Sequence, residues 1–287
     1  MEKNKIVKIT ETELIELISN TVKRVLSEGI SVNRVGEDNY VTFDGSDNGI
    51  QDGPVKGQLK LPNSDMVITT YSMFKRVNNL KGASDGNPIL HALKEKPHWI
   101  LNNPNDFWKR FDELLALFLK EHPSERIIMI PSNHDANYKF KEHIESLSPN
   151  TLVYTGILTK FTVDEIVDII EKKGSSFKKY WIQKGANLNE IYVKMYAYLE
   201  KMREENKGIF SYSMIPDMDI RKSISNTLKI GDAGNLYHNE FNGKNILLLD
   251  DSISVGQTAE SAINALQTCY EPQSISLLTI FSELYKI

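Results

Sequence analysis

Cysteine is nearly absent from this chain of 287 residues, which carries only Cys269. A single thiol excludes an internal disulfide and a zinc site built from cysteines. No apolar run approaches the roughly 20 residues needed to span a bilayer. The first residues, Met1 to Lys5, are too polar for a signal peptide. We therefore expect a cytoplasmic protein that does not enter a membrane.

An excess of charge of either sign is also missing. The chain has 34 Lys and Arg against 38 Asp and Glu, which gives a net charge of −4 at pH 7. That balance disfavours dedicated binding of nucleic acid, which calls for a strongly basic surface. The sequence also lacks the G-x-x-x-x-G-K-[ST] pattern, so a Walker-type nucleotide site is excluded.

Apolar residues make up 40% of the chain and charged residues 25%, values typical of globular proteins with a sizeable core. Beyond Pro88, strand-like and helix-like segments alternate. Helices are predicted over 105–121, 138–147, 163–172, 188–204 and 258–268, and strands over 126–130, 152–155, 209–215, 245–249 and 274–281. This alternation predicts an α/β fold, with a mostly parallel sheet flanked by helices.

The first 29 residues are predicted to form an amphipathic helix. Thr10 and Glu13 match a capping box, apolar residues then recur at helical spacing, and Gly29 ends the pattern. The helix either docks on its own domain or binds a protein partner. Residues 30–60, rich in Gly, Asp and Asn, are predicted to be a flexible linker. Residues 61–287 are then expected to form the main domain.

The segment from Asn245 to Thr258 carries the strongest chemical signal. Its four apolar residues, Ile246 to Leu249, suit a strand that is buried on both faces. Asp250 and Asp251 follow at the C-terminal end, where open α/β sheets bind their ligands. Because side chains alternate along a strand, the two carboxylates should diverge unless the chain has already begun to turn.

A short loop rich in hydroxyl groups follows the acidic pair and leads into a helix. Ser252, Ser254 and Thr258 supply hydroxyl donors around Gly256. The backbone N–H groups of such a loop and of the helix N-terminus favour an anion. Carboxylates beside an anion site suggest a sugar phosphate, whose hydroxyls or bound Mg²⁺ would meet the acids. The alternative is an ordinary strand-to-helix turn with solvated acids.

This arrangement resembles the phosphoribosyl-diphosphate (PRPP) motif of type I phosphoribosyltransferases. That motif has an apolar strand, two acids, two variable residues, two hydroxyl residues, Gly, a variable residue and Thr. The clear departure is Val255, where the family usually carries Thr or Ser. The resemblance implies a Mg²⁺-dependent enzyme that transfers ribose 5-phosphate from PRPP to a nitrogenous, base-like acceptor and releases diphosphate.

The resemblance also implies roles for the residues of the motif. Asp250 and Asp251 would be catalytic, binding the ribose hydroxyls and Mg²⁺. The 5′-phosphate would be bound by Ser252, Ser254, Val255, Gly256, Gln257 and Thr258. Because the family is often dimeric, the resemblance implies a homodimer.

Two further segments resemble diphosphate-binding elements of the family. The strand 126–130 is followed by Ser132, Asn133 and His134 and then by a helix, like the family's diphosphate loop. Proton transfer by His134 is one reading of that residue, and a hydrogen-bonded loop position is the other. Upstream of the main motif, Arg221 and Lys222 resemble basic residues of the ComF-like branch that reach toward diphosphate. For Lys222 the alternative is a solvated side chain.

The acceptor site is less readable. Four aromatic side chains could line a base pocket or could simply pack in a core: Trp181, Tyr192, Tyr196 and Tyr198. In the family the base is recognised by a variable hood, which here would come from residues 60–120 or 156–205. No base preference follows from either range.

A second hypothesis is a catalytically silent module with the same fold, acting as a binding protein or as a structural protein of a virion. Val255 and the tether-like N-terminal helix favour it. That helix, with Ile9–Leu14 and Val22–Glu28, resembles terminal helices in proteins of crAss-like bacteriophages. The resemblance implies a phage origin, and hence the host cytoplasm or the virion as location.

Overall fold

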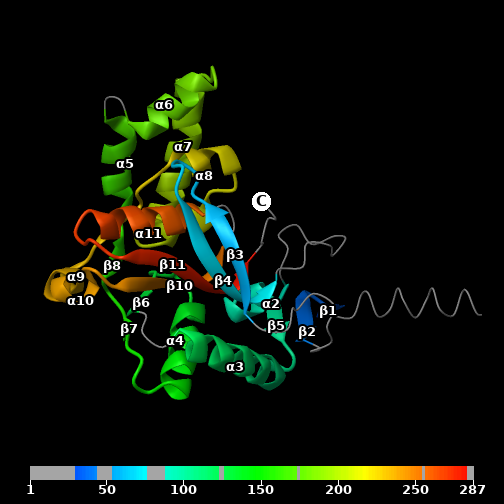
Figure 1. The fold of residues 1–287 in the computed structure, drawn as a ribbon. Helices are drawn as coiled ribbons and strands as arrows, with labels where there is room; N and C mark the ends of the chain where they lie inside the picture. The colour runs from blue at the N-terminus through cyan, green and yellow to red at the C-terminus, as the bar shows by residue number, and fades with distance from the viewer. Residues whose placement is uncertain are drawn as a thin grey trace, which may run out of the picture. The chain divides into compact units, whose positions relative to one another are not determined.

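The computed structural model describes residues 30–43, 54–75, 88–122, 126–172, 175–253 and 256–282 (Figure 1). The predicted N-terminal helix lies outside these ranges, as do Ser254 and Val255 of the predicted phosphate loop. The chain divides into two compact units, Met1–Asp52 with Arg76–Glu113 and Gly53–Lys75 with Leu114–Ile287. The main domain predicted over 61–287 is therefore split between the two units.

The first unit contains a three-stranded sheet. β1 (Ile30–Val35) and β2 (Asp38–Phe43) form an antiparallel hairpin, and β5 (Trp99–Leu101) pairs in parallel with β2. α2 (Pro88–Leu93) belongs to this unit, and α3 (Pro104–Glu121) begins in it.

The prediction of a flexible linker over 30–60 is wrong for the part of that range that the structure describes, which forms strands. Val41 and Phe43 alternate into the core, and the ring of Phe43 packs edge-to-face on Phe107 with the centroids 5.4 Å apart. Residues 55–60 form another strand, which belongs to the second unit. Gly36, one of the residues that suggested a linker, instead forms the hairpin turn, where its φ is +64°.

The second unit is built on a six-stranded sheet with the order β3-β4-β11-β10-β6-β7. β3 is antiparallel to β4, and every other neighbouring pair is parallel. The predicted α/β fold with a mostly parallel sheet is thus confirmed. The strands are β3 (Val55–Lys60), β4 (Val67–Lys75), β6 (Arg126–Met129), β7 (Val153–Tyr154), β10 (Asn245–Ile253) and β11 (Ser274–Ser282).

Helices cover both faces of this sheet. α4 (Ala136–Leu147) joins β6 to β7, and α11 (Gln257–Gln267) joins β10 to β11. β6 and β10 are neighbours, but β6 leads to β7 on one side of the pair and β10 leads to β11 on the other side. Since such crossovers are right-handed, the two helices lie on opposite faces, as Figure 1 shows. The topological switch point, where ligands bind in open α/β sheets, therefore lies between β6 and β10.

A helical subdomain, which we call the hood (residues 163–224), has an apolar core of its own on the α11 side of the sheet (Figure 1). A small antiparallel sheet of β8 (Leu158–Lys160) and β9 (Leu228–Ile230) lies at its base. The hood contains α5 (Val163–Glu171), α6 (Ser176–Gln183), α7 (Leu188–Glu205), the 3-10 helix η1 (Tyr212–Met214) and α8 (Met218–Ser223). The short helices α9 (Asp232–Leu236) and α10 (His238–Phe241) follow β9.

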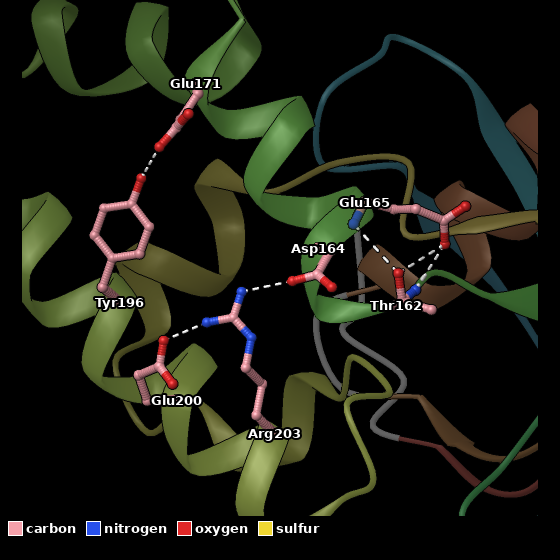
Figure 2. A network of polar contacts seen from close by, with 7 residues as sticks. All are labelled: Thr162, Asp164, Glu165, Glu171, Tyr196, Glu200 and Arg203. Atoms are coloured by element: carbon pink, nitrogen blue, oxygen red, sulfur yellow. Dashed lines mark hydrogen bonds and ion pairs between the residues drawn. The ribbon is translucent and has the colours of Figure 1, made fainter.

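Polar contacts bind α5 to α7 along the hood (Figure 2). Arg203 on α7 contacts Asp164 on α5 at 2.6 Å and also pairs with Glu200, while the hydroxyl of Tyr196 donates to the Glu171 carboxylate. Exposed ion pairs of this kind contribute little stability, because solvent screens the attraction between their charges. The apolar cluster, with Met195 and other side chains hidden from solvent, supplies most of the cohesion.

One predicted strand is wrong. Residues 209–215 contain only an isolated bridge from Ile209 to Thr162, followed by η1. Phe210 and Ile215 are 2% and 0% exposed and insert into the helical cluster, so burial is achieved without a sheet partner. In the described residues, no helix combines the length and the apolar character needed to cross a membrane.

Candidate functional site

The end of β10 separates the two acidic residues. The strand continues through Ile253, so the chain has not turned at Asp250 and Asp251 and their side chains point to opposite faces of the sheet. Asp250 shares the face of Ile246 and Leu248, which pack with α11, and it lines a cavity there. Asp251 is 5% exposed, lies away from that cavity and accepts a hydrogen bond of 2.7 Å from Ser252 Oγ.

The N-terminus of α11 presents hydrogen-bond donors at the cavity. Gly256 caps this helix in the left-handed conformation, with φ +83°, and as a glycine it offers no side chain to the amides of the first turn. Gln257 is 4% exposed, and its Nε2 is buried without a hydrogen-bond partner among the described residues. Unpaired donors at a helix N-terminus favour an anion because the helix dipole is positive there.

The cavity joins these two features. The space amounts to about 380 Å³ when the open solvent at its mouth is included. Its described walls are Tyr212, Arg221, Asp250, Ser252, Ile253, Gly256, Gln257, Thr258, Ala259 and Leu277. The structure thus brings together, around one space, six residues that the sequence singled out: Asp250, Ser252, Gly256, Gln257, Thr258 and Arg221.

The two basic residues on α8 lie differently. Arg221 is half-buried, its Nε donates to the carbonyl of Ile215, and its side chain forms part of the cavity wall. This hydrogen bond restricts the rotation of the guanidinium, since one of its five N–H groups is bound to the hood backbone. Lys222 is exposed and is not part of the wall, which fits its alternative reading as a solvated side chain.

The loop after β6 lies at the same edge of the sheet, and the amide of Ile130 donates to the carbonyl of Leu249 at 2.9 Å. Ser132 Oγ accepts from the His134 amide at 3.2 Å, and the Nδ2 of Asn133 donates to Asn206 Oδ1 at 3.1 Å. These three loop residues do not line the cavity.

Sequence reasoning missed the cation beside this loop. Lys160 Nζ on β8 donates to Asn133 Oδ1 at 2.6 Å, which brings a positive charge to the switch point. Nothing in the sequence signals this, because Lys160 lies 27 residues from its partner and follows a segment without a motif.

The four aromatic residues proposed for the acceptor pocket all belong to the hood's own packing. Trp181 is 6% exposed in the hood core, and the Tyr192 hydroxyl donates to the Ile170 carbonyl at 3.1 Å. Tyr196 is bound to Glu171 and Tyr198 packs against the same cluster, so the core reading holds for the set. The aromatic residue in the cavity is instead Tyr212.

Tyr212 is fixed at its hydroxyl. The O–H donates to the Ile224 carbonyl at 2.8 Å, and the hydroxyls of Thr227 and Ser261 lie nearby. Burial raises the pKa of Tyr212 to about 12, and those neighbouring hydroxyls only partly oppose the shift. At neutral pH the phenol is therefore protonated, and its ring forms a fixed wall of the cavity.

This shift predicts a loss of stability in alkali. An unfolded tyrosine loses its proton near pH 10, whereas folded Tyr212 keeps it to about pH 12. The folded state then binds more protons, so the contribution is complete below pH 10 and is lost as the pH rises to 12. Between pH 10 and pH 12 the free energy of unfolding of the wild type should fall by up to about 3 kcal/mol more than that of Tyr212→Phe. Urea unfolding of both proteins across this pH range measures the difference. Equal losses in the two proteins would contradict the assignment.

A divalent cation has a restricted set of ligands here. Among the residues that the structure describes, no group of three or more His, Cys, Asp and Glu side chains could hold a metal. Asp251 faces away from the cavity, so the predicted metal pair is not assembled. Mg²⁺ is often held by one carboxylate together with substrate phosphates. Asp250 alone fits that role, and the paired site does not.

No protein-family model, curated protein or solved structure matches the chain.

Proposed function

We propose that this protein is a Mg²⁺-dependent phosphoribosyltransferase that uses PRPP. The observation that carries the proposal is the cavity at the C-terminal end of β10, which combines the carboxylate of Asp250 with the N-terminus of α11. The Nε2 of Gln257, buried without a partner among the described residues, adds a further donor there. Together they suit a ligand that has hydroxyls at one end and a phosphate at the other.

Each wall would have a distinct role in binding. The 5′-phosphate would accept hydrogen bonds from the amides at Gly256, Gln257 and Thr258, where the helix dipole favours negative charge. The ribose hydroxyls would donate to Asp250 at the end of β10. Mg²⁺, when bound, would neutralise the diphosphate, and Asp250 would be its protein ligand.

The reaction would be catalysed mainly by position and charge. The bond between C1 and the diphosphate oxygen breaks, and diphosphate leaves with the bonding electron pair. A nitrogen of the acceptor then donates its lone pair to C1, which inverts the configuration there. Arg221 would stabilise the negative charge that develops on the leaving group, and the Tyr212 ring would exclude water from the reacting face.

The second hypothesis, a silent PRPP-binding module, also has support. The four aromatic residues proposed for a base pocket are used in the hood core, and one carboxylate of the motif faces away from the cavity. Such a module would bind PRPP without turning it over.

Two assays in sequence distinguish these proposals. Calorimetric titration of PRPP, with and without Mg²⁺, tests the site, and we expect Mg²⁺-dependent binding. Diphosphate release in the presence of a panel of nucleobases and their carboxylated analogues then tests turnover. Release with at least one acceptor supports the transferase, whereas binding without release across the panel supports the silent module. A folded protein that does not bind PRPP contradicts the transferase and the PRPP-binding module, and leaves a structural protein as the remaining form of the second hypothesis.

A further inference from the structure

A buried amide on α4 lies between the two strands of the switch point. Asn137 is 0% exposed in the first turn of this helix. Its Nδ2 donates to the carbonyl of Ile130 at 2.9 Å, at the end of β6, and to Asp250 Oδ1 at 3.3 Å, at the end of β10. An amide nitrogen has two hydrogens, so one group contacts both sides of the ligand crevice.

The same oxygen of Asp250 has a second donor. The backbone N–H of Asp251 donates to Asp250 Oδ1 at 2.9 Å. Two N–H groups that converge on one oxygen fix the rotation of the carboxylate about its side-chain bonds. Asn137 supplies a contact that comes from outside β10, so it ties the direction of the carboxylate to the position of α4.

Packing alone does not account for an asparagine at this place. The Oδ1 of Asn137 is buried and has no hydrogen-bond partner among the described residues. An unsatisfied buried acceptor destabilises a fold, and an apolar side chain of similar size would avoid that cost. Local violations of this kind concentrate where a site requires them.

From this geometry we infer that Asn137 is a positioning residue, which holds Asp250 and the β6 loop in the relative placement that binds the ligand. The inference rests on the proposed function for the identity of the ligand, PRPP. Asn137 does not line the cavity, so it acts through Asp250 and through the end of β6.

A double-mutant cycle tests this role. PRPP affinity in the presence of Mg²⁺ is measured by calorimetry for wild type, Asn137→Ser, Asp250→Ala and the double variant. We expect Asn137→Ser to weaken binding about tenfold in the wild-type background, and by less than about twofold once Asp250 is alanine. A purely structural asparagine would weaken binding by the same factor in both backgrounds, and that additivity would overturn the inference.

A matched control separates positioning from general loosening of the helix. Phe140 is one turn further along α4, is 0% exposed, and carries no polar group that could bind a carboxylate. Phe140→Leu should lower the melting temperature without weakening PRPP binding by more than about twofold. If Phe140→Leu also loses affinity tenfold, the effect of Asn137→Ser comes from general loosening of α4, and the inference is contradicted.

The melting temperatures of the same four proteins give a readout that needs no ligand. If Asn137 holds Asp250, the shifts caused by Asn137→Ser and Asp250→Ala are not additive. Wild type without affinity for PRPP would refute the proposed function. In that case coupled melting shifts would still support Asn137 as the residue that holds the carboxylate, and additive shifts would overturn that as well.

Discussion

Asp250→Ala is expected to weaken Mg²⁺-dependent PRPP binding by at least about 30-fold, because losing one partner of a buried charged contact costs about 2–5 kcal/mol. Asp250 is the carboxylate on the cavity wall, and we place both the ribose hydroxyls and Mg²⁺ against it. The measurement is calorimetric titration of each variant at fixed Mg²⁺. The fold should be retained, since the half-buried carboxylate borders open space.

The neighbouring acid provides the control for that prediction. Asp251 is buried on the other face of β10 and accepts from Ser252 Oγ. Asp251→Ala should therefore lower stability by about 1–3 kcal/mol, through the lost hydrogen bond and the cavity that remains. Its PRPP affinity at a temperature where it is folded should stay within a few-fold of wild type. If Asp251→Ala loses as much affinity as Asp250→Ala, the separation of the two acids is incorrect.

Gly256→Ala is expected to reduce PRPP affinity more than tenfold and to destabilise the protein by about 1–2 kcal/mol, the usual cost of a left-handed conformation for an L-residue. Gly256 has φ +83°, and a Cβ there would lie 3.1 Å from Leu59 Cδ2 on β3. This crowding is relieved by a shift of either the Leu59 side chain or the first turn of α11, and the strained left-handed backbone displaces the amides of that turn, which would face the anion. Titration calorimetry and thermal unfolding measure the two effects.

Gly243→Ala is the matched variant for this experiment. Gly243 also has a positive φ, +65°, but a Cβ there would meet nothing within 4 Å, and the residue lies outside the cavity wall. The two substitutions share the conformational cost, so Gly243→Ala should destabilise to a similar degree and leave PRPP affinity unchanged. Equal loss of affinity in both variants would show that the effect at Gly256 is not local to the site.

The main elements of the fold could be predicted because their sequence patterns are local. The helix predicted over 105–121 is α3, and the strand predicted over 245–249 is the first part of β10. The strand predicted over 209–215 is wrong for a physical reason: a short apolar run has the same pattern in a strand and in a loop whose side chains enter a helical core. Phe210 and Ile215 are buried, and the hood offers them helices to pack against rather than a neighbouring strand.

The part of the candidate site that lies in one continuous segment could be predicted from the sequence. Asp250, Gly256, Gln257 and Thr258 lie within nine residues, so their spacing alone indicates a strand, a turn and a helix N-terminus. The extension of β10 through Ile253, which turns Asp251 away, depends on pairing with β11 and could not be read from spacing.

Contacts between distant parts of the chain could not be predicted. Asn137 and Asp250 are separated by 113 positions, and only the adjacency of β6 and β10 brings them together. Tyr212 was hidden because its segment was assigned to a strand, and Lys160 reaches the β6 loop through the small sheet at the base of the hood. A single sequence carries no signal for such pairs.

The most direct test of the central claim, that a phosphate group binds at the N-terminus of α11 beside Asp250, is to map the backbone amide NMR shifts caused by PRPP and Mg²⁺. We predict that the largest shift changes fall on the amides of Gly256, Gln257 and Thr258, with further changes at the end of β10. The amide signals around Tyr192 and Tyr196 in the hood should not change. Saturable binding whose shifts fall elsewhere, or no shifts at all in the folded protein, would contradict the claim.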